Sequence, residues 1–342
     1  MFLTNLSQVL ARHDDLLIAS SPLLVNMPQD NFADHLQQIS VADEITFYDT
    51  QYDAHLFRDI SVKNNAIFHC QYQSKTLHDL VIMTFPKSKK ELTFTLSMLS
   101  ENLSENARIL VVGENKSGIK SMSKLTQDYH NTLDKIDTAR HCVLYELTLK
   151  QLPTFNLEDW FQYYDLTIEG EQCVIAALPG VFSQGGLDKG TKVLFEHLPK
   201  NLSGHVLDFG TGAGVIATYL AKTNQHITID LADVSALALA SAEKTLKINK
   251  LSGNLIATNS LSSISEQYDH VVTNPPFHQG TKTHYAATES FLAGIHKHIK
   301  SHGTLTVVAN SFLKYQPIMA SYFKKVSTAA IKHGFAVYSA LK

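Results

Sequence analysis

The chain has 342 residues, 44% of them hydrophobic and 18% charged, which predicts two domains and excludes a disordered or fibrous protein. Its net charge of −3 is unevenly distributed, because residues 1–180 contain 14 basic and 23 acidic side chains and residues 181–342 contain 15 and 9. The basic second half therefore suits a phosphate-bearing partner.

The first 24 residues do not have the pattern of a targeting segment. Arg12 and Asp14 interrupt their apolar residues, and no apolar run in the chain reaches the roughly 20 residues that span a bilayer. Cys70, Cys142 and Cys173 are an odd number of cysteines without metal-ligand spacing. We therefore expect buried, reduced thiols in a cytoplasmic protein, with no metal site and no membrane partner.

Two distant stretches share an acidic residue, an apolar strand and a proline-bearing loop. Residues 79–86 read Asp-Leu-Val-Ile-Met-Thr-Phe-Pro, and residues 269–276 read Asp-His-Val-Val-Thr-Asn-Pro-Pro. A second apolar strand follows in both copies. A basic residue and a histidine then precede a last strand, Arg140-His141 in one copy and Lys332-His333 in the other. One domain type repeated in tandem explains this order.

The first copy lacks the residues that would carry chemistry. Thr84 stands where the second copy has Asn274, and no glycine-rich loop precedes the Thr84 strand. We therefore expect a degenerate first domain, residues 1–165, that acts as a scaffold or contacts the substrate. The second domain, residues 166–342, is expected to be catalytic, and proline and glycine residues punctuate the chain around this boundary.

The second domain contains the pattern of a nucleotide-binding fold. A short apolar strand runs into Asp208-Phe209-Gly210-Thr211-Gly212-Ala213-Gly214, and a helical pattern follows. Strand, glycine loop and helix begin a doubly wound sheet, and the glycines let backbone N–H groups approach a ligand. Asp208 would repel a pyrophosphate but attract the ammonium group of S-adenosylmethionine, which disfavours a dehydrogenase. Asp208, Gly210, Gly212 and Gly214 are therefore predicted to bind this cofactor.

Two more residues are predicted at the cofactor site. Asp233 ends the next apolar strand, 19 positions after Gly214, which is about the spacing of a carboxylate that binds ribose hydroxyls. Asp230 competes for this role but lies in the middle of the strand. Asn259 follows the third strand, where its amide could donate and accept at the adenine edge or could simply cap a turn.

The loop Asn274-Pro275-Pro276-Phe277 follows the fourth strand of this domain. In a doubly wound sheet, the tip of that strand faces the same crevice as the glycine loop. The prolines stiffen the turn, so the Asn274 amide and the Pro275 carbonyl can accept hydrogen bonds from a planar amino group and align its lone pair with a sulfonium methyl. Phe277 offers a face for stacking a base. Asn274, Pro275 and Phe277 are the predicted catalytic residues.

Several further strings accompany these loops. They are Pro179-Gly180-Val181-Phe182-Ser183, Leu187-Asp188-Lys189-Gly190 and Asp233-Val234-Ser235 in the second half, and Val111-Val112-Gly113-Glu114-Asn115-Lys116-Ser117-Gly118 and Lys135-Ile136-Asp137-Thr138-Ala139-Arg140 in the first. With them the chain resembles the bacterial guanine-N2 methyltransferases of small-subunit ribosomal RNA, over nearly its whole length.

This resemblance implies an α/β fold of two tandem Rossmann-like (class I) methyltransferase domains, of which only the second binds S-adenosyl-L-methionine. It implies methyl transfer to the exocyclic N2 of one guanosine in 16S rRNA of the 30S subunit, as a step of ribosome biogenesis. By motif match, Asp208 and the three loop glycines would bind the methionine end, Asp233 the ribose, and Asn274 and Phe277 the target base. A complete two-domain chain is expected to be a monomer.

Other functions fit parts of the pattern. A glutamine-N5 methyltransferase uses a similar loop on a planar amide, usually with Tyr at the position of Phe277, and a DNA adenine-N6 methyltransferase is a third enzyme of this kind. A non-catalytic ribosome assembly factor with a vestigial fold is the alternative from another class. The intact Asp208 loop and Asn274 argue against that last alternative.

Overall fold

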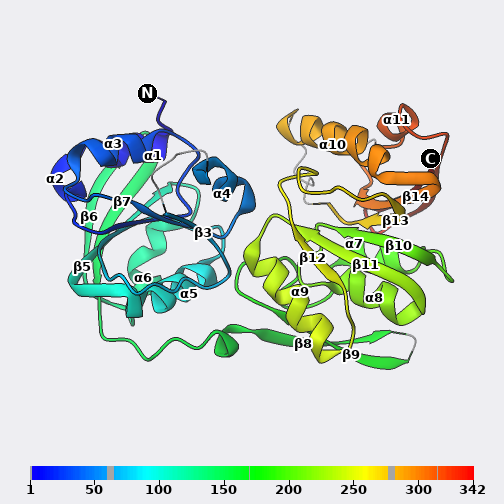
Figure 1. The fold of residues 1–342 in the computed structure, drawn as a ribbon, viewed down its shortest axis with the longest axis horizontal. Helices are drawn as coiled ribbons and strands as arrows, with labels where there is room; N and C mark the ends of the chain where they lie inside the picture. The colour runs from blue at the N-terminus through cyan, green and yellow to red at the C-terminus, as the bar shows by residue number, and fades with distance from the viewer. Residues whose placement is uncertain (1, 60–64, 169, 276–281, 314) are drawn as a thin grey trace. The chain divides into compact units, whose positions relative to one another are not determined.

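The computed structural model describes residues 2–59, 65–168, 170–275, 282–313 and 315–342. The chain forms two compact units, Met1–Trp160 and Phe161–Lys342, which Figure 1 shows in blue to green and in green to red. The expected boundary at residue 165 instead falls inside β8 (Gln162–Ile168). Because β8 pairs with β9 (Glu171–Ala177), which packs against a helix of the second unit, the whole hairpin belongs to that unit.

Among the described residues of the first unit, seven strands form one sheet in the order β3-β2-β1-β4-β5-β7-β6. The five strands from β3 to β5 are parallel, and β7 and β6 add an antiparallel hairpin. The strands are β1 (Pro22–Val25), β2 (Thr46–Asp49), β3 (Asn65–Phe68), β4 (His78–Thr84), β5 (Leu103–Glu114), β6 (His130–Ala139) and β7 (Cys142–Leu149). The helices are α1 (Asn5–Leu10), α2 (Asp14–Leu17), α3 (Phe32–Ile39), α4 (Tyr52–Asp59), α5 (Lys89–Leu99) and α6 (Met122–Thr126), with short 3-10 helices η1 (Ser100–Asn102), η2 (Ile119–Ser121) and η3 (Leu157–Trp160).

The second unit repeats this arrangement, with a sheet in the order β12-β11-β10-β13-β14-β16-β15. Its strands are β10 (Ser203–Phe209), β11 (His226–Asp233), β12 (Asn254–Ala257), β13 (Tyr268–Thr273), β14 (Ile299–Asn310), β15 (Lys325–Lys332) and β16 (Phe335–Leu341). The helices are α7 (Lys189–Phe195), α8 (Val215–Thr223), α9 (Ala236–Ile248), α10 (Lys282–Ile295) and α11 (Tyr315–Ala320), with the 3-10 helix η4 (His296–His298). The strand order of the two sheets is the same position by position, as tandem duplication predicts.

Irregularities recur at the same positions in both sheets. The register shifts between His78 and Leu80 at the β4–β5 pair and between Tyr268 and His270 at the β13–β14 pair. Each C-terminal hairpin closes on two residues with positive φ, Arg140-His141 in one unit and His333-Gly334 in the other, as a tight two-residue turn requires. The expected match of Arg140-His141 with Lys332-His333 is therefore wrong by one position, because Lys332 still pairs with Phe335 in the sheet.

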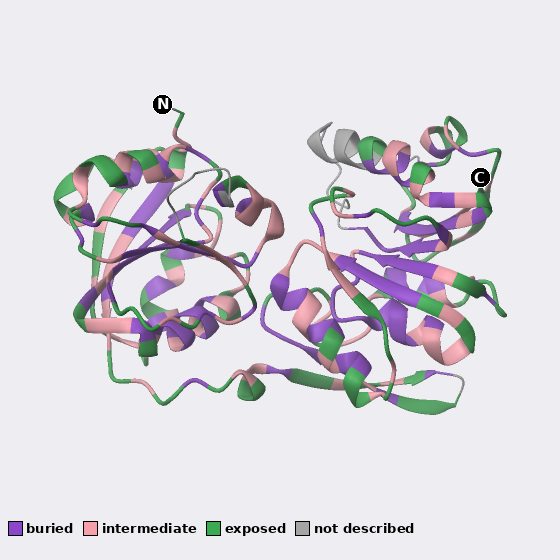
Figure 2. Ribbon diagram, in the orientation of Figure 1, coloured by how far each residue is buried: buried purple, intermediate pink, exposed green. Residues whose placement is uncertain are grey.

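The central strands are covered on both faces, so they consist of nearly continuous apolar residues. Residues 80–83 of β4 and 206–209 of β10 are all buried, and Figure 2 shows these sheets as the buried interior of each unit. The three cysteines are buried as well. Within the described part of the chain, no helix has the length and apolar character needed to cross a membrane.

Polar side chains of α9 hold the edge of β9 in place. Ser241 and Thr245 of α9 and its C-cap Asn249, spaced one turn apart, accept hydrogen bonds of 3.0 Å from the backbone N–H groups of Leu178, Ala176 and Val174. The Asn249 amide also donates to the Val174 carbonyl at 2.7 Å. These bonds satisfy a strand edge that pairs with no further strand in the described part of the chain, and they fix the path of the chain as it leaves β9 towards the candidate site.

Candidate active site

The glycine loop between β10 and α8 has the backbone geometry that was expected. Gly210, Gly212 and Gly214 have φ values of 71°, 55° and 76°, which side chains with a Cβ rarely adopt. A Cβ on Gly214 would also lie 3.1 Å from the Cα of Ala242 in α9. The loop therefore needs glycine for its conformation and, at Gly214, for its close packing.

Asp208 lies at the end of β10 and is fully buried. Its Oδ2 accepts hydrogen bonds from the Thr211 hydroxyl at 2.6 Å and the Ala217 backbone N–H at 3.1 Å. Its Oδ1 is buried without a hydrogen-bond partner among the described residues. Burial raises the pKa of this carboxyl to about 7, although the Thr211 and Ala217 bonds oppose the change. Such a group is suited to an ammonium ligand, which would supply both a donor and a positive charge.

Asp233 is held at the carboxyl end of β11 by backbone groups. Its two oxygens accept from the N–H groups of Gly212 and Ser235, each at 2.9 Å, and burial raises its pKa. The competing Asp230 is buried earlier in the same strand, where it accepts from the Tyr268 hydroxyl at 2.8 Å. Asp233 therefore lies against the glycine loop, whereas Asp230 lies within the core.

Asn259 follows β12, as expected, but its side chain is exposed. The backbone carbonyl of Asn259 accepts from the Ser262 backbone N–H at 3.1 Å, so the residue takes part in a turn. The preceding Thr258 connects this turn to β11, since its N–H donates to the Asp233 carbonyl at 3.0 Å. The structure thus shows Asn259 in the turn role, and Asn259 is not among the residues that line the pocket beside the glycine loop, so its contact with adenine stays a prediction.

Asn274 is 92% buried at the tip of β13 and lines a pocket with the glycine loop. Its amide nitrogen donates to the Thr191 hydroxyl at 2.9 Å and to Asp188 Oδ2 at 3.2 Å. Pro275 is buried directly after it, whereas Phe277 lies outside the described residues. The pocket is lined by Phe182, Ser183, Thr191, Gly210, Thr211, Gly212, Ala213, Val215, Ile216 and Asn274.

Four residues at this site that lie outside the glycine loop and α8 were not predicted as functional. Phe182 and Ser183 line the pocket after β9, and Thr191 and Asp188 contact Asn274 from the start of α7. Phe182 is 57% exposed, and Ser183 has a φ of 60°, a conformation that often marks functional sites. Asp188 and Phe182 belong to strings that carried the family resemblance, but only folding brings them to residues 210–216 and Asn274.

The first unit has a different arrangement at the equivalent positions. Leu24 stands at the position of Asp208, because the two residues pair at the same register with the equivalent strands β4 and β13. Asp49 stands at the position of Asp233, because the two residues end the equivalent strands β2 and β11. Leu24 is buried and apolar. Thr84, at the position of Asn274, donates its hydroxyl to the Asn26 carbonyl at 2.7 Å. This unit therefore retains one of the two carboxylates and has leucine and threonine at the positions of Asp208 and Asn274.

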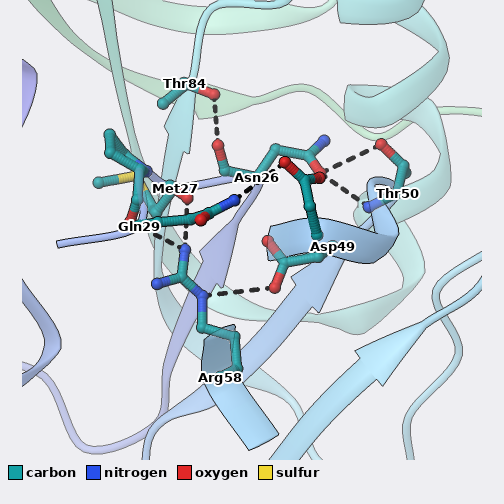
Figure 3. A network of polar contacts seen from close by, with 9 residues as sticks. Asn26, Met27, Gln29, Asp49, Thr50, Arg58 and Thr84 are labelled. Atoms are coloured by element: carbon teal, nitrogen blue, oxygen red, sulfur yellow. Dashed lines mark hydrogen bonds and ion pairs between the residues drawn. The ribbon is translucent and has the colours of Figure 1, made fainter. Parts of the chain in front are cut away.

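Arg58 occupies the neighbourhood of the remaining carboxylate, as Figure 3 shows. Its guanidinium donates to the carbonyls of Met27 and Pro28, in the loop after β1, and its Nε lies 3.4 Å from Asp49 Oδ2. Burial raises the pKa of Asp49 to about 6, against the opposing effect of Arg58. In the second unit a backbone N–H, that of Gly212, donates to the carboxylate Asp233. In the first unit the loop instead presents backbone carbonyls, which accept from the Arg58 guanidinium.

Comparison with known proteins assigns the chain to a family. Residues 172–339 match the family described as "Methyltransferase small domain", and residues 7–164 match "Methyltransferase small domain N-terminal". The proteins named ribosomal RNA small subunit methyltransferase C from Colwellia psychrerythraea and Pseudoalteromonas translucida are 47% and 40% identical to this chain. The alignments cover 99% and 98% of this chain, and 98% and 99% of the respective relatives. The chain belongs to the ribosomal RNA small subunit methyltransferase C family.

A solved structure has the same fold over nearly the whole chain. The 16S rRNA N2 G1207 methyltransferase of T. thermophilus, in complex with AdoMet and guanosine, superposes with a TM-score of 0.81 over 97% of this chain and 92% of its own, at 20% identity. The expected α/β fold of two tandem methyltransferase domains is therefore confirmed, as are the expected family and the enzyme class, a methyltransferase.

Proposed function

We propose that the second unit transfers a methyl group from S-adenosyl-L-methionine to the exocyclic N2 of one guanosine in 16S rRNA. The observation that carries this proposal is the buried Asn274 at the rim of a pocket formed with the glycine loop. Membership of the family supports the substrate, as does the fold shared with the T. thermophilus enzyme that acts on G1207. The assembled 30S subunit as substrate, a monomeric state and a cytoplasmic location are parts of the same proposal.

The residues of the pocket have separate roles in this proposal. Asp208 would bind the methionine ammonium, the loop glycines would present N–H groups to the methionine end, and Asp233 would bind the ribose. Asn259 is assigned to the adenine edge. S-adenosylmethionine supplies an electrophilic methyl on a sulfonium, which leaves as a neutral thioether.

The chain contributes positioning of the amine. The Asn274 side-chain oxygen and the Pro275 backbone carbonyl would accept hydrogen bonds from the two N–H groups of the target amine, which favours a pyramidal nitrogen with its lone pair directed at the methyl. The same acceptors stabilise positive charge as it develops on that nitrogen, which loses one proton to water once the new N–C bond has formed. Alignment of this kind contributes on the order of several kcal/mol without a general base. Phe277 would stack on the base. The first unit, with its site occupied by Arg58, would act as a scaffold or contact the rRNA.

The test is transfer of tritium from labelled S-adenosylmethionine to 30S particles that lack the modification, followed by digestion to nucleosides. We expect label in N2-methylguanosine. Asn274→Ala should abolish transfer, because the amine loses its acceptor, while cofactor affinity measured by calorimetry stays nearly unchanged. Thr84→Ala is the matched control, since Thr84 is the equivalent position in the first unit, and it should retain transfer.

The same experiment separates the alternatives. Label in a ribosomal protein or a release factor would indicate a glutamine-N5 methyltransferase, and label in DNA would indicate an adenine-N6 methyltransferase. Cofactor binding without transfer to any of these substrates would favour a non-catalytic assembly factor. A product other than N2-methylguanosine would overturn the proposed target atom.

A further inference from the structure

The amide of Asn274 is held by two residues from the start of α7. Its Nδ2 donates to the Thr191 hydroxyl at 2.9 Å and to Asp188 Oδ2 at 3.2 Å. Asn274 and Thr191 are 8% and 5% exposed, so little water competes for these bonds. These contacts join a strand tip to a helix that lies 86 positions earlier in the sequence.

The chemistry of these partners determines which way the amide points. The two ends of an asparagine amide are similar in size, and only their hydrogen-bond partners distinguish them. An ionised carboxylate accepts hydrogen bonds and cannot donate them. The Asn274 nitrogen must therefore face Asp188, because the reversed amide would place two acceptor oxygens against each other. The carbonyl oxygen is consequently directed to the opposite side of the amide.

Asp188 is itself fixed in place. It is the N-cap of α7, where its Oδ2 also accepts from the Thr191 backbone N–H at 3.0 Å. The next residue but one, Gly190, allows the helix to pack closely on β16, because a Cβ there would lie 2.9 Å from the Phe335 ring. One carboxylate oxygen thus connects the helix start to the Asn274 amide.

We propose that Asp188, with Thr191, is a positioning residue that keeps the Asn274 carbonyl oxygen directed towards the target amine. The inference rests on the proposed function, in which that oxygen accepts a hydrogen bond from the amine. An amide held in this way presents an acceptor to the substrate, so it selects a group that donates N–H and disfavours a carbonyl. On guanine, this distinguishes the exocyclic N2 from O6.

The first test removes the Asp188 acceptor at little cost to the start of the helix. Glycine is tolerated at a helix N-cap, so Asp188→Gly should lower kcat for 30S methylation by on the order of 10²-fold through misorientation. Cofactor affinity and melting temperature should change little. Asp188→Asn, whose side-chain carbonyl can still accept, should keep most of the activity. Thr191→Val should lower kcat, and Thr191→Ser should retain it.

The second test exchanges donor and acceptor. Asn274→Asp places a second carboxylate against Asp188 and should lose nearly all transfer. Adding Asp188→Asn restores an N–H donor between the two positions, so the double variant should be at least about tenfold more active than Asn274→Asp alone. If Asp188 served only as a helix cap, the two losses would multiply instead.

The outcomes distinguish this inference from the function on which it rests. Wild-type transfer together with full kcat for Asp188→Gly and Thr191→Val would overturn the positioning role and leave the proposed function intact. Multiplied losses in the double variant would overturn it as well. Absence of N2-methylguanosine with the wild-type protein would overturn the proposed function, and the inference with it.

Discussion

Asp208 combines two properties at the scale of a single residue. A buried oxygen without a hydrogen-bond donor costs free energy, and Asp208 Oδ1 is such an atom among the described residues. Burial also raises the pKa of this carboxyl to about 7, and the nearby Asp233 carboxylate adds to the effect. An ammonium ligand would reverse both conditions, because it donates hydrogen bonds and stabilises the ionised form.

This environment predicts that cofactor affinity depends on pH. In the free protein Asp208, with a pKa of about 7, is increasingly protonated as the pH falls below 7, while the complex requires it ionised. Binding then releases a proton, so affinity should decrease by about tenfold for each pH unit well below 7 and be highest between about pH 7 and the pKa of the ligand's own α-amino group, roughly 8. Calorimetric titration of the protein with S-adenosylmethionine measures this slope.

The matched control for that titration is Asp208→Asn, which removes the titrating group. Its affinity should be lower at neutral pH and should lose the slope near pH 7. A wild-type affinity that stays constant from about pH 5 to pH 8 would show that Asp208 does not ionise on binding. The ammonium contact would then have to come from another group.

At the scale of an element, the placement of α7 matters more than its own stability. This helix has seven residues, fewer than an isolated helix needs in water. Its position depends on the cap at Asp188 and on the close packing of Gly190 against Phe335 in β16. Glycine usually weakens a helix, but here it permits an approach that presents Asp188 and Thr191 to Asn274.

Gly190→Ala is therefore expected to be harmful, although alanine favours helices by about 1 kcal/mol. The new Cβ would lie 2.9 Å from the Phe335 ring and 3.0 Å from Asp188 Oδ2. Overpacking of this kind costs about 1–3 kcal/mol. A loss of unfolding free energy of this size should lower the melting temperature of the second unit by a few degrees. The value of kcat should fall as well.

Two variants make this prediction specific. Adding Phe335→Leu to Gly190→Ala gives the new methyl room, so it should restore both the melting temperature and kcat. Gly185→Ala is the control, since a Cβ there meets no atom within 4 Å, and it should behave like the wild type. Equal losses in Gly185→Ala and Gly190→Ala would contradict the packing argument.

At the scale of the whole molecule, the chain contains the same sheet twice and a candidate cofactor site once. The strand orders agree throughout, and so do the positions of the register shift after His78 and Tyr268. The chemistry differs because Leu24 replaces an acid and Arg58 pairs with Asp49. A fold can therefore persist after its ligand site is lost, since the sheet depends on buried apolar strands rather than on the loops at their ends.

We expect one cofactor site per chain, and Thr84→Asn should not create a second. The amide alone would restore neither the acid at Leu24 nor the glycine loop, and Arg58 would still face Asp49. Calorimetry should give a stoichiometry of one bound cofactor for both the wild type and Thr84→Asn. In the tritium assay, Thr84→Asn combined with Asn274→Ala should show close to zero methyl transfer. A stoichiometry of two in either protein would contradict this account.

Several features could be predicted from the sequence because they depend on neighbouring residues. The glycine loop is identified by its own spacing, and the apolar strands by their continuous hydrophobic character, so the fold and its repeat followed from local pattern. The unit boundary did not follow, because β8 belongs with the strand and helix on which it packs. The hairpin alignment at Lys332 was wrong for a similar reason, since strand pairing decides where that turn begins.

The sequence by itself determined the type of protein: two α/β units, the second with an acid, a glycine loop and Asn274 at the ends of parallel strands. Only the tertiary structure showed that Asp188 and Thr191 contact the Asn274 amide, and that Arg58 occupies the site of the first unit. The physical reason is the range of the interactions. Periodicity and turn chemistry act between residues close in the chain, whereas a hydrogen bond between residues 86 positions apart exists only once the sheet has brought a strand tip and a helix start together.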